Sequence, residues 1–309
     1  MRKSCQIVFI VGPTASGKSD IALELAQRIK GEIVCCDSMQ IYKEISIASN
    51  KASQEELEKV KHYLINVASV EEAFDVARYN ELANQAIAEI LNNGRVPIVV
   101  GGSGLYFQIL LDGIFSAEGR NETVRQRFKE MAEAMGSEAL HRQLALVDPQ
   151  AAGRIHPNDE RRIIRALEVY ETTQEPISKL QPQRRGLWET HEAKVFGIKM
   201  ERELLYERIN ARVERMIAAG LVDEVKSLSP ASLSLTAQHL IGIKEVLEYL
   251  QGHIDLETAV EKIKQNTRQF AKRQLTWFRK DARIEWIDAK PSDLKAAALE
   301  IYKELREHG

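Results

Sequence analysis

Residues 12–19 read GPTASGKS, which matches the G-x-x-x-x-G-K-[ST] pattern of a phosphate-binding P-loop. An apolar, β-branched run at 6–11 precedes this motif, and apolar residues at helical spacing follow it at 18–30. Between a strand and a helix, the glycines allow backbone N–H groups to face phosphate oxygens, and the helix N-terminus adds positive charge. The lysine would neutralise phosphate charge, and the last serine offers a hydroxyl suited to Mg²⁺. The predicted phosphate-binding residues are Gly12, Pro13, Thr14, Ala15, Ser16, Gly17, Lys18 and Ser19, with Ser19 as the Mg²⁺ ligand.

Strand and helix patterns alternate along the chain from this motif onward. Short apolar runs at 32–36, 63–67 and 96–100 predict buried strands, and helical spacing at 76–92 and from 104 onward separates or follows them. This alternation is typical of an α/β fold in which a parallel sheet is covered by helices on both faces.

The pattern changes between about 118 and 190, where helical segments and prolines occur without a convincing strand. A strand pattern returns at 194–200, and the remaining chain is mostly helical apart from a short apolar run at 284–287. We therefore expect a core formed by 1–117 and 191–309, interrupted by a helical insertion domain at 118–190.

Composition places the chain among ordinary globular proteins. Its 309 residues are 44% hydrophobic and 28% charged, which argues against disorder and against a fibrous repeat. No apolar run is long enough for a membrane span, and the first residues lack the pattern of a signal peptide. Three cysteines form neither a disulfide framework nor a zinc spacing, so we expect a cytoplasmic protein with no membrane partner.

Two further candidates for chemistry lie where predicted strands end. Asp37 follows the strand at 32–36, and Ser103 lies in the turn GGSG that follows the strand at 96–100. The carboxyl ends of parallel strands meet at one edge of the sheet, beside the P-loop. Asp37 is there a candidate general base or Mg²⁺ ligand, although an aspartate at this point also caps turns. The strand at 96–100 ends without the aspartate typical of a nucleotide-hydrolysing motor, which argues against that class.

The net charge of −2 conceals two basic regions. Residues 154–165 are rich in arginine, and residues 260–283 contain eight basic and only two acidic side chains. Either region is a solvated helix face or a contact surface for the phosphates of a nucleic acid. The second region also fits a membrane-surface helix.

The P-loop is one of six blocks that together carry a family resemblance. The blocks are GPTASGKS at 12–19, DSMQIYK at 37–43, GGSGLYF at 101–107, RIHPNDERRIIRALEVY at 154–170, RELLYERINARVERMIAAGLVDEV at 202–225 and TRQFAKRQLTWFR at 267–279. With these blocks, the chain resembles the bacterial tRNA dimethylallyltransferases, also called tRNA isopentenyltransferases. The P-loop occurs in many enzymes, whereas the blocks at 154–170 and 267–279 are specific to this family.

The resemblance implies a P-loop kinase-like core with a helical insertion. It also implies transfer of the dimethylallyl group from dimethylallyl diphosphate to N6 of the adenosine 3′-adjacent to the tRNA anticodon, with release of diphosphate and assistance by Mg²⁺. The implied partners are the tRNA anticodon stem-loop and dimethylallyl diphosphate, and we expect the protein to be a monomer.

Several residues match family positions with known roles. Asp37 matches the general base, Ser103 matches a residue near the bridging oxygen of the diphosphate, and Arg208 is a candidate for a second diphosphate contact. Lys272 and Arg273 are additional electrostatic candidates for tRNA binding. The predicted tRNA contacts are Asp37, Ser38, Met39, Gln40, Ser103, Arg125, Arg161, Arg162, Ile163, Ile164, Arg165, Lys272 and Arg273.

The chain departs from the usual family pattern after Asp37. Met39 replaces a common arginine, Glu44 replaces a glycine, and Ile243 replaces a tyrosine, while the segment 39–52 differs in general. These departures keep other functions open. The alternatives are a P-loop small-molecule kinase, an adenylate isopentenyltransferase that modifies free nucleotides, and an RNA-binding protein with a vestigial P-loop.

Overall fold

A computed structural model describes residues 7–114, 121–230 and 232–307. The chain forms two compact units, of which the first combines Met1–Leu111 with Thr190–Gly309 and the second is Asp112–Glu189. The second unit therefore begins N-terminal to residue 118, the start that the sequence pattern suggested. Within the described ranges, none of the helices combines the length and the apolar character that crossing a membrane requires.

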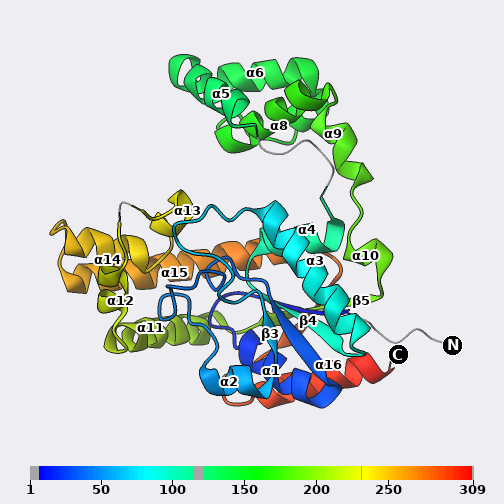
Figure 1. The fold of residues 1–309 in the computed structure, drawn as a ribbon, viewed down its shortest axis with the longest axis vertical. Coiled ribbons are helices and arrows are strands. Elements are labelled where there is room, and N and C mark those ends of the chain that lie inside the picture. Colours follow the sequence, from blue (N-terminus) through cyan, green and yellow to red (C-terminus); the bar gives the residue numbers. More distant parts are fainter. Residues whose placement is uncertain (1–6, 115–120, 231, 308–309) are drawn as a thin grey trace. The chain divides into compact units, whose positions relative to one another are not determined.

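A six-stranded parallel sheet forms the centre of the first unit (Figure 1), as the alternating pattern predicts. Its strands follow the order β3-β2-β4-β1-β5-β6. Every residue of the first two strands is buried, as is typical of a parallel sheet with helices on both faces. The strands are β1 (Ile7–Val11), β2 (Gly31–Cys35), β3 (His62–Tyr63), β4 (Val96–Gly101), β5 (Ala193–Lys199) and β6 (Ile284–Asp288).

The third strand is shorter than the apolar run at 63–67 suggests, so that prediction was wrong in its extent. Strand β3 ends at Tyr63 because Leu64 and Asn66 adopt φ angles of 62° and 60°. This left-handed conformation is incompatible with an extended strand. The strand pairs with β2 through His62 and Tyr63 and then gives way to a loop.

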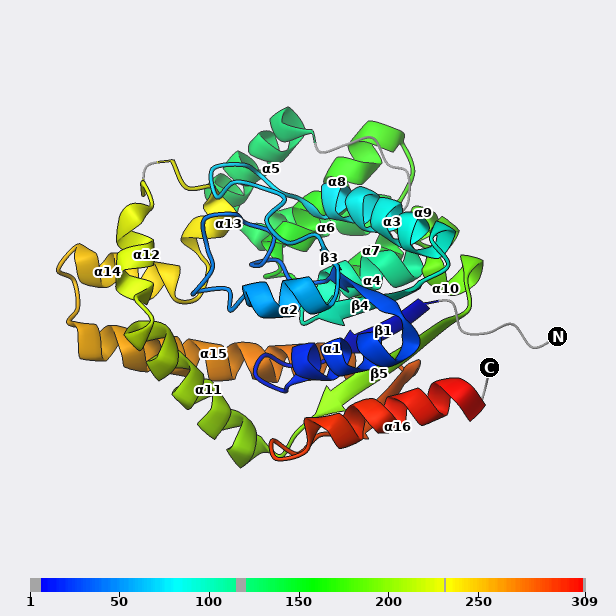
Figure 2. The same ribbon diagram turned by 60° about the horizontal axis from the view of Figure 1, so that its bottom comes forward.

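Alternate residues of β1 pack on opposite faces of the sheet. Val8 and Ile10 belong to a buried cluster with α1 (Lys18–Ile29) and α16 (Leu294–Glu307), which lie side by side (Figure 2). Phe9 points the other way.

On that second face, aromatic side chains join three elements. The ring of Phe9 meets Phe107 edge-on, and Phe107 meets Phe278 in the same manner, with both pairs of ring centroids 5.7 Å apart. Phe107 belongs to α4 (Gly104–Asp112), and Phe278 ends α15 (Leu256–Phe278). These contacts hold the P-loop strand beside both helices.

Further helices of the first unit occur between β2 and β6 in the chain. Helix α3 packs on β2 and β4, and α15 contacts both α11 and α14. Of the cysteines that the structure describes, Cys35 and Cys36 are free and buried. These helices are α2 (Gln54–Lys59), α3 (Val76–Asn92), α11 (Arg202–Ala218), α12 (Leu221–Ser227), α13 (Leu235–Gln238) and α14 (Ile243–Leu250).

The second unit is helical, and no strand occurs in the part of it that the structure describes. Its core is a cluster of buried side chains that includes Phe128, Leu140, Ile163 and Leu167. Buried Asp148 joins two of its short helices, because it accepts the N–H groups of Ala151 and Ser178 at 2.9 Å. The helices are α5 (Glu122–Met135), α6 (Ser137–Val147), α7 (Pro149–Ala152), α8 (Glu160–Thr173), α9 (Ile177–Leu180), a 3₁₀ turn (Gln181–Gln183) and α10 (Leu187–Thr190), which ends at the boundary.

Candidate active site

The predicted P-loop curls between β1 and α1. Gly12 has a φ of 152°, and a Cβ at this position would lie 2.7 Å from the carbonyl oxygen of Ile198 on β5. Gly17 has a φ of 86° and precedes the first turn of α1. Both positions need glycine, the first for close approach to the neighbouring strand and the second for its left-handed conformation. The turn therefore directs the N-terminus of α1 toward the carboxyl edge of the sheet.

Lys18 lies buried at the start of α1, and its Nζ donates to the carbonyl oxygen of Pro13 at 3.2 Å. The pKa of Lys18 is lowered to about 8, chiefly by burial and to a smaller extent by the neighbouring Arg212, while the Asp37 carboxylate opposes both effects. A buried ammonium group with these neighbours gains most from a ligand that brings negative charge.

Two cavities meet at this edge of the sheet, and both lie within the first unit. The first has a volume of about 360 Å³ and a mostly polar wall that includes Lys18, Ser19 and Arg208. The second has a volume of about 470 Å³ and a more apolar wall that includes Ile209 and Phe270. The residues that line both cavities are Thr14, Asp37, Ser49 and Arg212.

Asp37 follows β2 and lies between the two cavities. Its Oδ1 accepts the backbone N–H of Met39 at 2.9 Å, which fixes the carboxylate in a local turn. Its Oδ2 forms no hydrogen bond with any residue in the described ranges. The side chain is half-buried, so it is able to accept a proton from a molecule in either cavity.

Oxygen donors suited to a hard cation are present in the first cavity. The hydroxyl of Ser19 and the carboxylate of Asp37 both line its wall. Among the described residues, no three His, Cys, Asp or Glu side chains gather as a metal cage. A site with few protein ligands suits Mg²⁺, which usually retains waters and binds substrate phosphates.

Helix α11 contributes two arginines to the P-loop. Arg208 Nε donates to the carbonyl oxygen of Ala15 at 2.9 Å, and Arg212 Nη1 donates to Thr14 Oγ1 at 2.9 Å. The sequence prediction selected Arg208 and missed Arg212, although only Arg212 lines both cavities. Burial lowers the pKa of Arg212, and the charge of Asp37 opposes this effect. The spacing of four residues between the arginines, which puts both on one helix face, was the available signal.

The loop after β4 brings Ser103 to the second cavity. Ser103 caps α4, because its Oγ accepts the backbone N–H of Tyr106 at 3.5 Å. The backbone N–H of Ser103 donates to the carbonyl oxygen of Cys36 at 3.2 Å. A Cβ on Gly101 would lie 1.9 Å from the Cys36 carbonyl oxygen, so only glycine permits this approach. The close packing places the Ser103 loop directly beside the end of β2.

Gln274 on α15 joins this loop to the P-loop, and the sequence reasoning missed it. Its Oε1 accepts the backbone N–H of Thr14 at 2.8 Å, and its Nε2 donates to the carbonyl oxygen of Gly102 at 2.9 Å. The side chain is buried and forms part of the wall of the second cavity. One amide group therefore fixes the separation of two loops that line the site.

The segment after Asp37, where the chain departs from the family pattern, folds over the site. Gln40 Nε2 donates to the carbonyl oxygens of Ser49 and Asn50. Glu224, on α12, accepts three backbone N–H groups of this loop, those of residues 46–48, at 2.7–2.8 Å. These bonds keep the loop ordered despite its unusual sequence.

The predicted contacts at 38–40 divide between the cavities. Ser38 and Met39 line the second cavity, whereas Gln40 lines the first. Ile243, at another departure from the family pattern, is fully buried at the start of α14. It is thus a core residue and presents no side chain to a ligand.

The two predicted basic residues of α15 differ in their surroundings. Lys272 and Arg273 are both exposed, and Arg273 lines the second cavity. The Arg273 guanidinium also lies 5.8 Å from the ring centroid of Phe270. Arg273 therefore offers positive charge at the wall of the apolar cavity, beside the exposed ring of Trp277.

Only some of the tRNA contacts predicted in the arginine-rich segment of α8 are exposed to solvent. Arg161 and Arg162 are exposed. Ile163 and Ile164 are buried in the core of the helical unit, so the prediction that they contact tRNA was wrong for their side chains. Their apolar side chains instead hold α8 in place, as helical spacing requires.

Comparisons with known proteins agree with one another. A family model described as "IPP transferase" matches residues 40–281. A protein of Geobacter metallireducens named tRNA dimethylallyltransferase is 47% identical over 285 residues, which cover 92% of both chains. A protein of Geobacillus thermodenitrificans with the same name is 45% identical over 303 residues, which cover 96% of this chain and 95% of that one.

Solved structures show the same relationship. The tRNA isopentenylpyrophosphate transferase of Bacillus halodurans aligns with a TM-score of 0.71 and 38% identity, and the alignment covers 99% of this chain and 98% of that one. A eukaryotic dimethylallyltransferase described as acting on tRNA aligns with a TM-score of 0.82 and 29% identity, over 97% of this chain and 78% of that one.

Proposed function

We infer that the chain, which belongs to the IPP transferase family, is a tRNA dimethylallyltransferase. It transfers the dimethylallyl group of dimethylallyl diphosphate to N6 of the adenosine 3′-adjacent to the tRNA anticodon, and diphosphate is released. The observation that carries this proposal is the pair of cavities that meet at Asp37. A polar cavity beside an apolar one suits a substrate with a diphosphate head and a hydrocarbon tail.

The polar cavity supports binding and departure of the diphosphate. The N-terminus of α1, the Lys18 ammonium and the Arg212 guanidinium supply positive charge where the leaving group gains negative charge. Mg²⁺, when bound with help from Ser19, supplies further neutralisation of the phosphate oxygens. Arg208 supports this cavity through its bond to Ala15, which holds the P-loop backbone.

The acceptor reacts at the boundary between the cavities. The amine nitrogen of adenine attacks the carbon that bears the diphosphate, a C–N bond forms, and the C–O bond to diphosphate breaks. Asp37 accepts the proton that the amine loses, since its carboxylate lines both cavities. Ser103 lies at the second cavity beside this point and is able to donate a hydrogen bond to the bridging oxygen. The apolar wall excludes water, which would otherwise compete with the amine.

The adenosine must leave the stack of the anticodon loop to reach this point, as bases do in other nucleic-acid-modifying enzymes. Exposed basic residues support binding of the surrounding RNA, among them Arg273 at the second cavity and Arg161 and Arg162 of the helical unit. Because one chain supplies every residue named for the reaction, we propose a monomer as the active form, and the cytoplasm, where tRNA is modified, as its location.

A transfer assay tests the proposal. The purified protein is incubated with labelled dimethylallyl diphosphate, Mg²⁺ and unmodified tRNA, and the nucleosides are separated by chromatography. The expected product is N6-dimethylallyladenosine next to the anticodon, formed by a protein that elutes as a monomer. Equal modification of free AMP would indicate an adenylate isopentenyltransferase. Phosphorylation of a small acceptor by ATP would indicate a kinase, and RNA binding without any transfer would indicate a vestigial P-loop.

A further inference from the structure

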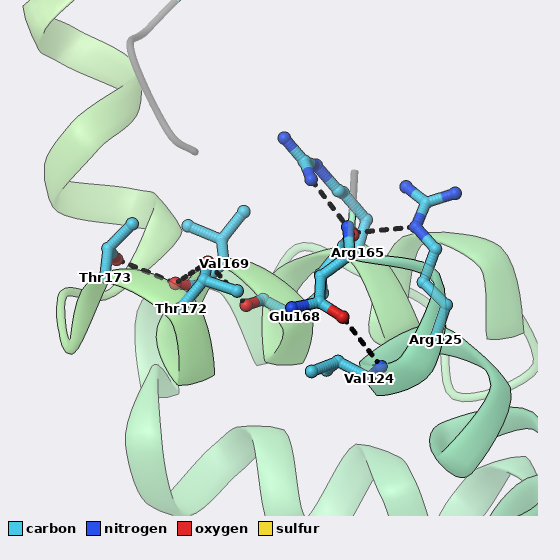
Figure 3. A network of polar contacts seen from close by, with 8 residues as sticks. Val124, Arg125, Arg165, Glu168, Val169, Thr172 and Thr173 are labelled. Carbon is cyan, nitrogen blue, oxygen red and sulfur yellow. Dashed lines mark hydrogen bonds and ion pairs between the residues drawn. The ribbon is translucent and has the colours of Figure 1, made fainter. Parts of the chain in front are cut away.

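A single buried carboxylate joins α5 and α8 in the helical unit. Glu168 on α8 is fully buried, and its Oε2 accepts hydrogen bonds from Arg125 Nε and Arg165 Nη1, each at 2.9 Å (Figure 3). Its Oε1 accepts the backbone N–H of Asn121 at 2.8 Å. All these residues belong to the helical unit, so the network does not depend on the position of the other unit.

The energetics of this network explain why the carboxylate stays charged. Burial raises the pKa of Glu168, but the hydrogen bonds from Arg165, Asn121 and Arg125 lower it more, so the net pKa lies below its usual range. Removing one partner of such a buried charge pair is costly, because the remaining charges lose their compensation. The network is therefore a rigid element of the unit.

The network also fixes where the two arginines point. Asn121 caps α5 by accepting the N–H of Val124 at 3.1 Å, and Arg125 lies in the first turn of that helix. Glu168 thus holds the start of α5 against α8, one turn after Arg165. Figure 3 shows the guanidinium groups of Arg125 and Arg165 meeting at this carboxylate from two different helices.

Among the residues that the structure describes, Glu168 is the only hydrogen-bond partner of either arginine side chain. Their bonds to Glu168 employ only Nε of Arg125 and Nη1 of Arg165, while a guanidinium carries several further N–H groups in a planar fork. The two side chains are 24% and 34% exposed. An arginine that is already held in place loses less conformational entropy when it binds a phosphate.

We propose that Glu168 is a positioning residue for RNA binding, which holds Arg125 and Arg165 as an oriented pair whose remaining N–H groups contact tRNA phosphates. This inference rests on the proposed function, because it takes tRNA as the substrate. It goes further by assigning a role in RNA affinity to an acidic residue that touches no RNA itself.

Net surface charge and orientation of the arginines predict opposite effects of removing the Glu168 carboxylate on tRNA affinity. If only net charge matters, removal of the carboxylate makes the surface more positive, and tRNA binds more tightly. If orientation of the arginines matters, the same removal weakens binding, because both guanidinium groups must then be ordered by the RNA. The sign of the effect therefore separates the two explanations.

The chain offers a matched control on the same pair of helices. Glu171, three residues further along α8, forms an ion pair with Arg127 of α5, and both side chains are partly exposed. Glu168→Gln and Glu171→Gln remove the same charge from the same helix, but only the first disturbs Arg125 and Arg165. The dissociation constant of tRNA is measured for both variants over a range of salt concentrations, together with KM for each substrate.

The expected result is an increase of about tenfold in the Kd and KM for tRNA with Glu168→Gln, while KM for dimethylallyl diphosphate stays at the wild-type value. Glu171→Gln is expected to leave tRNA affinity unchanged or to raise it slightly. Binding of Glu168→Gln that equals or exceeds that of Glu171→Gln would overturn the proposal. A wild-type protein that does not modify tRNA would refute the proposed function instead, whatever the variants do.

A second variant keeps the test valid if Glu168→Gln does not fold. Arg125→Lys retains the positive charge but lacks the planar fork that reaches both the carboxylate and a phosphate. The positioning role predicts that Arg125→Lys also weakens tRNA binding by several-fold. Unchanged affinity in a folded Arg125→Lys variant contradicts the proposal, and circular dichroism melting establishes that the variant is folded.

Discussion

Gln274 Oε1 lies 2.8 Å from the backbone nitrogen of Thr14, although the two residues are 260 positions apart in the sequence. The bond joins α15, a helix of 23 residues, to the P-loop, and the same amide donates to the carbonyl oxygen of Gly102. The conformation of the P-loop thus depends on a side chain from α15 as well as on its own glycine turns and the arginines of α11.

Gln274→Glu should lower activity more than it lowers stability. A glutamate still accepts the Thr14 N–H, but it cannot donate to Gly102 and it brings negative charge to the cavity wall. We expect kcat/KM for dimethylallyl diphosphate to fall at least about tenfold, with a loss of about 1–3 kcal/mol in unfolding free energy. Steady-state kinetics and denaturant melts measure both. Gln265→Glu, on an exposed position of the same helix, is the control and should resemble the wild type.

Asp37→Asn should abolish transfer while the protein still binds both substrates. The asparagine Oδ1 still accepts the Met39 N–H, so the turn is preserved, but the side chain no longer accepts a proton. Loss of a general base lowers kcat by about 10²–10⁴-fold. Asp20→Asn is a suitable comparison, because Asp20 lines only the polar cavity. Near-normal kcat in Asp37→Asn would remove Asp37 from the base role.

Arg212→Gln should damage the reaction more than Arg208→Gln. Arg212 lines both cavities and binds Thr14 Oγ1, whereas Arg208 lines the polar cavity alone and binds a backbone oxygen. A charge at the junction acts on the leaving group with little screening by water. We expect a fall of about 10²-fold in kcat/KM for Arg212→Gln. Parallel kinetics of the two variants decide the order, and a larger defect in Arg208→Gln would reverse our assignment.

The stability of the helical unit should depend on pH through Glu168. Its folded pKa lies below the ordinary value, so its contribution is present above the unfolded pKa of about 4.3 and is lost as pH falls through the folded pKa. The Tm difference between wild type and Glu168→Gln should therefore be large near pH 6 and shrink toward about pH 3. Calorimetry over this range measures it. A difference that stays constant with pH would mean that the ionised carboxylate does not stabilise the unit.

Much of the architecture could be predicted because it depends on local patterns. Helix α3 has the predicted range Val76–Asn92, since Asp75 caps its start and Asn93-Gly94 ends it. The sheet followed from short buried runs between helices. The length of strand β3 was predicted wrongly, because the mostly apolar run at 63–67 gives no sign of the left-handed backbone of Leu64 and Asn66. Composition alone does not reveal such a conformation.

The candidate site was only partly predictable. The positions of the P-loop and of Asp37 could be predicted from local sequence patterns. Glycine spacing indicates the P-loop, and Asp37 directly follows a predicted strand. Gln274 carries no such signal, and Arg212 has only its spacing of four residues from Arg208, because the roles of both come from contacts with Thr14. The same holds for Glu168, which looks like an ordinary helical glutamate until its burial against Arg125 and Arg165 is seen.

The sequence by itself thus determined the α/β class, the glycine turn between β1 and α1, and the family. Each of these rests on neighbouring residues, whose spacing sets backbone conformation and direction. Only the tertiary structure decided which distant side chains complete the site and which arginines are held by a buried carboxylate. A hydrogen bond forms only when its two atoms lie within about 3 Å with the right alignment, and the packing of helices on the sheet creates that proximity.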